Sequence, residues 1–130
     1  MKFATWNCAM GLKKKRQHLL NLRADVMVIQ ECSQQDTEQF SQTAEWSSSW
    51  LGKNKNKGLG VLAKAPWVIR EAQALNTKWA SKVIIEGPAS IELFPVWACM
   101  AKNWPGFAGD QELEVGQLKC SPKFRQVAKV

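Results

Sequence analysis

The segment Asp25-Val26-Met27-Val28-Ile29-Gln30 constrains the fold more than any other part of this chain. Its apolar side chains occupy both alternating faces of an extended backbone, so a strand here must be covered on both sides. A strand of this kind belongs at a central position of a sheet that lies between two other layers. The chain is therefore expected to build a layered domain around residues 25–30.

The rest of the pattern supplies the other elements. A strand is predicted at residues 2–7, and apolar residues on one helical side predict an amphipathic helix at residues 12–22. The polar residues 33–43 indicate a surface helix or loop, with Ser33 as the N-cap of such a helix. Pro95 indicates an edge position or a bulge for the last strand. Further short strands, separated by turn residues, are predicted at 45–51, 58–63, 67–74, 79–86 and 90–98.

The order strand, helix, strand, followed by a run of strands, predicts an α+β fold: one mostly antiparallel sheet with a covering helix. The 130 residues are expected to form a single domain, in which residues 101–130 differ in character from the rest. No apolar run approaches the roughly 18 residues of a membrane span, and the N-terminus is too short and polar for a signal peptide. We therefore expect a cytoplasmic protein without a membrane partner.

The charge is uneven along the chain. Its 18 basic and 11 acidic residues give a formal charge of +7, and the excess is concentrated in Lys13-Lys14-Lys15-Arg16 and in Lys53, Lys55 and Lys57. A localised basic surface favours a polyanion such as nucleic acid, whereas a plain solubilising surface is the alternative. Most of the seven tryptophans are expected in the core, and Trp50, close to the second basic group, is the one expected to stack on bases.

The four cysteines show no spacing typical of a zinc site. We expect them to be reduced and mostly buried, as small apolar residues. His18, on the polar side of the predicted helix, is expected to be a solvated surface residue. A soft-metal site formed by Cys8, Cys32 and His18 is the alternative.

Two polar residues stand at the ends of two predicted strands. Asn7 ends the strand 2–7, and Glu31 follows the strand 25–30. An amide and a carboxylate that converge at strand ends are typical of sites that bind hard cations and cleave phosphate esters. Two structural alternatives stay open: Asn7 as a turn-former that caps the following loop, and Glu31 as a solvated or ion-paired carboxylate.

The segment Phe3-Ala4-Thr5-Trp6-Asn7, then the helix, then Ala24 to Glu31 resembles the opening of the endonuclease/exonuclease/phosphatase superfamily, which includes the AP endonucleases and DNase I-like enzymes. Asn56 to Lys64 resembles the next strand of that family, and Ile91 to Ala98 the one after it. The likeness covers residues 2–98. It implies that this part is half of a four-layered α/β/β/α sandwich.

The resemblance also implies roles for two residues. Asn7 would orient the scissile phosphate through its amide, and Glu31 would bind magnesium or manganese. The reaction would be metal-assisted attack of water on a phosphodiester or phosphomonoester. Both residues are thus the candidate catalytic pair, with Glu31 as the metal ligand.

The later motifs of the family are not matched. Gly109-Asp110-Gln111-Glu112 is similar to its Gly-Asp turn only in part, and nothing matches its catalytic histidine, since His18 lies in the first helix. We therefore expect a truncated, non-catalytic domain that binds phosphate groups or nucleic acid through its basic face. One alternative is a metal-dependent phosphodiesterase whose site is completed by a second subunit. The other is a rearranged protein of unrelated function.

Half of a two-sheet sandwich would leave one apolar face of the strand 25–30 open. Soluble monomers generally avoid such a patch, and burying about 800 Å² per partner would suit an ordinary symmetric interface. A homodimer that packs two sheets face to face is therefore expected. The alternative is that residues 101–130 fold back over this face.

Overall fold

The computed structural model describes residues 1–76 and 79–98. Its helices are short, and most of the described chain is extended. In chain order the elements are β1 (Phe3–Asn7), α1 (Arg16–Asn21), β2 (Val26–Cys32), α2 (Gln34–Glu38), β3 (Trp46–Asn54), β4 (Lys57–Lys64), β5 (Val68–Ala74), β6 (Ser81–Glu86) and β7 (Ser90–Leu93).

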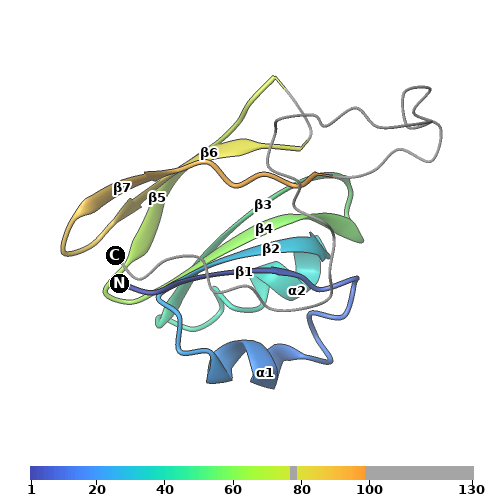
Figure 1. Ribbon diagram of the computed structural model, residues 1–130, viewed down its shortest axis with the longest axis horizontal. Helices are drawn as coiled ribbons and strands as arrows, with labels where there is room; N and C mark the ends of the chain where they lie inside the picture. The colour runs from blue at the N-terminus through green and yellow to red at the C-terminus, as the bar shows by residue number, and fades with distance from the viewer. Residues whose placement is uncertain (77–78, 99–130) are drawn as a thin grey trace, which may run out of the picture.

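The elements form three layers (Figure 1). The middle layer is a mixed sheet in the order β1-β2-β4-β3, in which β1 and β2 are parallel and the other neighbours are antiparallel. The helices α1 and α2 lie on one face of this sheet, and a second, antiparallel sheet β5-β6-β7 lies on the other. The predicted α+β fold with a helix-covered sheet is confirmed, and the strands divide between two sheets as in a partial sandwich.

The strand β2 holds the central position expected from its sequence, between β1 and β4. Met27 and Ile29 are buried on the helix side of the sheet, whereas Val26 is buried on the side of the second sheet. Since both faces of this strand are covered, its continuous apolar run is accounted for.

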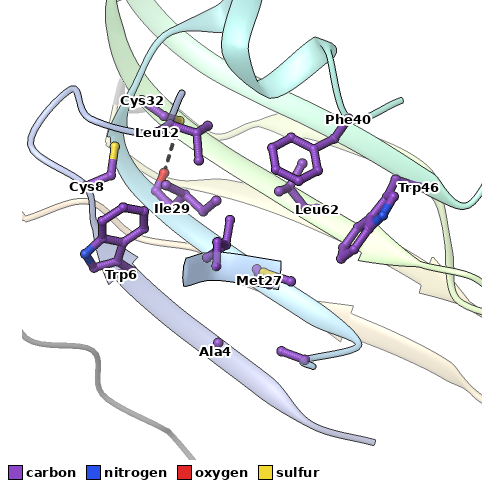
Figure 2. Close-up of a cluster of buried hydrophobic side chains, with 12 residues drawn as sticks. Ala4, Trp6, Cys8, Leu12, Met27, Ile29, Cys32, Phe40, Trp46 and Leu62 are labelled. Carbon is purple, nitrogen blue, oxygen red and sulfur yellow. Dashed lines mark hydrogen bonds between the residues drawn. The ribbon is translucent and has the colours of Figure 1, made fainter. Parts of the chain in front are cut away.

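The larger core lies between the mixed sheet and the helices (Figure 2). Leu19 of α1 and Phe40, just after α2, are fully buried there. The Phe40 ring meets the Trp46 ring edge-on, with 5.6 Å between centroids. The buried residues of this cluster are Ala4, Trp6, Cys8, Leu12, Leu19, Ala24, Met27, Ile29, Cys32, Phe40, Trp46 and Leu62.

A second core lies between the two sheets. Val26 and Val61 of the mixed sheet pack with Val83 and Ile85 of β6 and with Trp67. From the sequence, one apolar face of this strand was expected to need a cover from a second chain or from residues 101–130. The Val26 face of β2 is instead covered by the second sheet of the same chain.

The helices differ from the prediction in length. The first was expected over residues 12–22 but spans only Arg16–Asn21, with Leu12 buried in the preceding turn. Lys15 is the N-cap of this helix, and its side chain makes no capping hydrogen bond. In α2 the predicted cap is confirmed, because the Ser33 hydroxyl accepts a hydrogen bond of 3.0 Å from the Asp36 N–H.

Several smaller expectations are also tested. The strand β7 is an edge strand, as Pro95 indicated, but it ends at Leu93, whereas a strand over residues 90–98 was predicted. Cys8 and Cys32 are buried free thiols, and His18 is exposed. Trp104, Cys99 and Cys120 lie outside the described residues. Within the described ranges, no helix has the length and apolar character needed to cross a bilayer.

Candidate functional site

The parallel pairing of β1 and β2 sets Asn7 opposite Gln30, so Asn7 and Glu31 lie at neighbouring strand ends. The loop after β1 is tied to the end of β2 by two backbone hydrogen bonds. The Cys8 N–H donates to the Gln30 carbonyl at 3.0 Å, and the Met10 N–H donates to the Glu31 carbonyl at 2.8 Å. The sequence-predicted pair is therefore brought to one end of the mixed sheet.

The backbone at this end is left-handed at three non-glycine residues. The φ angles are 46° at Ala9, 62° at Met10 and 59° at Glu31. Glu31 also lies where the pairing of β2 with β4 shifts register, between Gln30 and Cys32. A bulge of this kind re-aims a side chain relative to strict strand alternation, so the direction of Glu31 is a local feature of the bulge.

The Asn7 side chain forms a turn. Its Oδ1 accepts a hydrogen bond of 3.0 Å from the Ala9 N–H. Because a backbone N–H can only donate, the amide oxygen must face Ala9, and the Asn7 NH₂ group is the part of the amide that is left to act outward. The structural alternative for Asn7 is therefore observed, and the group it offers to a ligand is a donor.

The Glu31 carboxylate is ion-paired. The Lys57 Nζ lies 3.4 Å from its Oε1, and only 19% of the Glu31 side chain is exposed, against 38% of the Lys57 side chain. Lys57 is the first residue of β4, next to Gly58, which pairs with Cys32. The ion pair thus bridges the ends of the two antiparallel neighbours β2 and β4.

An aromatic ring also lies near the same ammonium group. The Lys57 Nζ is 5.7 Å from the centroid of the Trp97 ring, within the range of a cation–π contact. Trp97 is buried, and its indole N–H has no hydrogen-bond partner among the described residues. Lys57 was expected to contact nucleic acid, but its pairing with Glu31 and its contact with Trp97 were not foreseen.

These residues do not fit a magnesium or manganese ion. Within residues 1–76 and 79–98, no group of three histidine, cysteine or acidic side chains could hold a metal. The one carboxylate at the strand ends already has a cation beside it, and the Asn7 amide presents its NH₂ group, whereas these metals require oxygen ligands. Asp110, the weak additional candidate, lies outside the described residues.

The first basic segment has two kinds of residue. Lys13, Lys14 and Lys15 are exposed and Arg16 is half-buried, but the Lys15 Nζ also lies 5.5 Å from the Trp6 ring, and the Arg16 guanidinium lies 4.2 Å from the Phe40 ring. Since the last two side chains pack on the outer edge of the helix-side core, a change at either would also alter packing. Lys13 and Lys14 are the residues whose charge is most available to a partner.

A groove of about 630 Å³ brings parts of the two basic segments together. Lys13, from the loop before α1, and Lys55, from the β3–β4 turn, both line it, while Lys53 is exposed nearby in the sequence. Acidic side chains of α2 also contribute, so the groove is of mixed charge. Its lining residues are Met10, Lys13, Ser33, Gln34, Gln35, Asp36, Glu38, Lys55 and Asn56.

Trp50 is turned toward the protein. Its indole N–H donates a hydrogen bond of 3.1 Å to the Cys32 carbonyl, and its ring packs over Gly52 and Gly58. The side chain is half-buried, so base stacking by Trp50 stays a prediction. Its observed contacts hold the β3–β4 hairpin against the end of β2, and this hairpin carries Lys57.

The two described cysteines are not nucleophiles at neutral pH. Burial raises the pKa of the Cys8 thiol, and burial, as the main cause, raises the pKa of the Cys32 thiol to about 12. Both thiols are therefore neutral at pH 7. They serve as small core residues, as expected from the sequence.

Comparison with protein-family models finds no match for this sequence, and comparison with curated proteins finds none either. Comparison with solved structures does find similar folds. The described chain has the fold of part of the endonuclease/exonuclease/phosphatase proteins, which confirms the resemblance read from its strand ends.

Three of these structures illustrate the match. The 3′–5′ exonuclease NExo from Neisseria meningitidis is 17% identical, with a TM-score of 0.55 over 75% of this chain and 41% of its own. D. rerio TDP2 complexed with a single-strand DNA product is 12% identical, with a TM-score of 0.54 over 72% and 44%. TDP2 from C. elegans is 14% identical, with a TM-score of 0.53 over 72% and 34%. This chain therefore spans less than half the length of the structures it matches.

Proposed function

We propose that this protein is a non-catalytic domain that binds phosphate groups or nucleic acid through its basic residues. The observation that carries the proposal is the ion pair between Glu31 and Lys57. The family resemblance implies that Glu31 binds a metal. In this structure, the Lys57 ammonium group pairs with the Glu31 carboxylate instead. The strand ends thus offer hydrogen-bond donors and a cation, which suit an anionic oxygen better than a metal.

The surroundings of the strand ends support the same ligand. The loop that carries Met10 and the turn that carries Lys55 border both the Glu31–Lys57 pair and the groove. Lys13 and Lys55 add positive charge there, with Lys14 and Lys53 exposed close by in the sequence. The similarity to a TDP2 structure that holds single-strand DNA makes a nucleic acid the ligand that we propose.

The proposed function does not include catalysis, and the reason is chemical. Proton transfer by a positioned acid or base and stabilisation of developing charge each supply large rate factors in phosphate chemistry. His18, which is exposed on α1, is the histidine of the described residues, and it has no place in the group formed by Asn7, Glu31 and Lys57. These residues can bind a phosphate, but the group contains no histidine, and its ammonium, that of Lys57, is paired with Glu31.

The proposal is tested by measuring hydrolysis and binding side by side. Plasmid DNA and a generic phosphodiester are incubated with magnesium or manganese, and binding of a labelled single-stranded oligonucleotide is measured on the same preparations. We expect binding without turnover. Metal-dependent turnover that is lost in Glu31→Gln would contradict the non-catalytic assignment.

A metal-dependent phosphodiesterase completed by a second subunit is the second candidate. It is favoured by the position of Asn7 and Glu31 at neighbouring strand ends, where the resemblance requires them. Its signature is turnover per chain that rises with protein concentration, because the site would be complete only in the dimer. If neither turnover nor binding is found, the third alternative, a rearranged protein of unrelated function, is favoured.

Two further parts of the proposal concern the state of the protein. We propose a homodimer and a cytoplasmic location, the latter in keeping with the two free thiols. Because the chain's own second sheet covers Val26, a dimer would use another surface. Among the exposed large apolar side chains of the described residues, Phe94 and Val96, which follow the edge strand β7 and are 54% and 46% exposed, are close together in the sequence and are the contact that we propose.

A further inference from the structure

We propose that Lys57 is the resident cation of the strand-end site, which replaces a divalent metal and binds phosphate oxygens directly. This inference rests on the proposed function, since it names the group that recognises the phosphate. The residues that fit a metal poorly are suited to bind an anion. Recognition here should not require a metal.

The burial of the pair is the first support. Glu31 is 19% exposed, and its carboxylate needs a cation in this half-buried position. A second pair on the same strand shows the contrast. At the far end of β4, Lys64 lies 3.0 Å from Glu45, whose side chain is 57% exposed, so that pair is an ordinary surface contact.

The position of Lys57 is the second support. Its ammonium lies near both the Glu31 carboxylate and the Trp97 ring, and its side chain remains 38% exposed. An ammonium group has three N–H donors. One directed at Glu31 leaves two for oxygens that arrive from solvent, as a phosphate would supply.

Trp97 provides the third support. Its ring lies beside the Lys57 ammonium, and its buried N–H is unpartnered within residues 1–76 and 79–98. A buried donor without an acceptor is costly and calls for a ligand or an ordered water. The Asn7 NH₂ group is a further donor at the end of β1, the neighbouring strand of β2.

Glu31 then has an effect on phosphate binding opposite to that of a metal ligand. Glu31 holds the Lys57 ammonium in place and also lowers its net attraction for an anion. Replacing Glu31 with glutamine removes the negative charge while keeping a hydrogen-bond acceptor of similar size. Phosphate binding should then be retained or strengthened, whereas a metal-dependent site would lose it.

The experiment is a fluorescence anisotropy titration of a short single-stranded oligonucleotide, with and without a 5′-phosphate, in EDTA and again in manganese. The variants are Lys57→Gln, Lys57→Arg and Glu31→Gln. Lys64→Gln is the matched control, because Lys64 has the same kind of partners, a glutamate and a tryptophan ring, at the other end of β4. Inorganic phosphate is used as a competitor to separate recognition of phosphate alone from recognition of the strand.

We expect binding to be equal in EDTA and in manganese and to weaken about tenfold in Lys57→Gln, as for loss of a charged hydrogen bond. Lys57→Arg should keep most of the affinity, and Lys64→Gln should match the wild type. Glu31→Gln should bind as well or better. Thermal unfolding of each variant verifies that a loss of binding is not a loss of fold.

Other outcomes separate the two proposals. If the wild-type protein binds no oligonucleotide at all, the proposed function fails. If it binds but Lys57→Gln behaves like Lys64→Gln, the proposed function stands and the role of Lys57 is overturned. Binding that is abolished by EDTA, or bound manganese detected by electron paramagnetic resonance and lost in Glu31→Gln, would also overturn it by restoring a metal at Glu31.

Discussion

The indole N–H of Trp50 donates a hydrogen bond of 3.1 Å to the carbonyl oxygen of Cys32. This bond joins the β3–β4 hairpin to the end of β2, where the pairing of β2 and β4 shifts register. Because Lys57 begins β4, the same bond helps to fix the position of the ammonium group beside Glu31. A core contact and the candidate site are thus coupled through one hairpin.

Replacing Gly58 with alanine should destabilise this hairpin. The new Cβ would overlap the Trp50 ring and lie 2.5 Å from the Leu51 carbonyl oxygen, so the ring would have to leave its place. We expect the free energy of unfolding, measured in urea, to fall by about 1–3 kcal/mol. In a Trp50→Ala background the same change should cost less. An equal cost in both backgrounds would show that the ring is not the obstacle.

The Cys32 thiol should make stability fall at alkaline pH. Its pKa is raised from 9.0 to about 12 in the folded protein, so between these values the unfolded thiol ionises while the folded thiol stays protonated. The unfolded state then binds fewer protons, and stability decreases as pH rises, by up to about 1.4 kcal/mol per pH unit from this group.

The check is urea unfolding from pH 8 to pH 10.5 with Cys32→Ala. The variant should lose part of the alkaline slope after allowance for its lower stability at pH 8. Native-state alkylation gives a second reading, because the Cys32 thiolate should be trapped only as fast as the protein opens. Identical slopes in the variant and the wild type would exclude this assignment.

Lys13 and Lys14 should contribute to nucleic-acid affinity through charge alone. Both are exposed, whereas Lys15 and Arg16 also pack on aromatic rings. Neutralising the first two with glutamine should weaken binding and reduce the slope of log K against log salt by about 0.7 for each lost contact with a single strand.

The control for that double variant is neutralisation of two lysines that are engaged in ion pairs elsewhere. Lys64 pairs with Glu45, and Lys82 pairs with Glu92 on the second sheet. Changing both to glutamine removes the same formal charge. If the control lowers the salt slope as much, the effect is one of net charge, and the basic segment has no special part in binding.

A homodimer should be visible by light scattering at micromolar concentration as twice the mass of one chain. Replacing Phe94 and Val96 with serine should shift this mass toward the monomer, because these exposed apolar side chains are the proposed contact. A monomeric mass for the wild-type protein would contradict the dimer. A dimer that both serines leave intact would require a different surface.

Much of the fold could be predicted from local patterns. The apolar run around Met27 predicted a central strand, Ser33 predicted a helix cap, and Pro95 predicted an edge position for the last strand. Each rests on a rule that acts within a few residues, such as side-chain alternation or a missing N–H donor. The first helix was predicted too long, because Leu12, which fits the apolar periodicity, is buried in the turn that precedes the helix.

The candidate site was predicted only in part. Asn7 and Glu31 were found because each stands at the end of a strand, and two parallel neighbours bring such ends together. Lys57 was predicted to belong to a basic surface, since no local rule states that the first residue of β4 contacts the end of β2. That contact depends on the register shift beside Cys32, which the sequence does not display.

The sequence by itself determined which segments are strands, which strand is central and which polar residues end the first two strands. These are properties of short segments, set by periodicity and backbone preference. The tertiary structure alone decided that the strands divide into two sheets, that Val26 is covered by β6, and that Glu31 is neutralised by Lys57. Such contacts join residues far apart in the chain, so they arise only when the sheets pack and their registers are fixed.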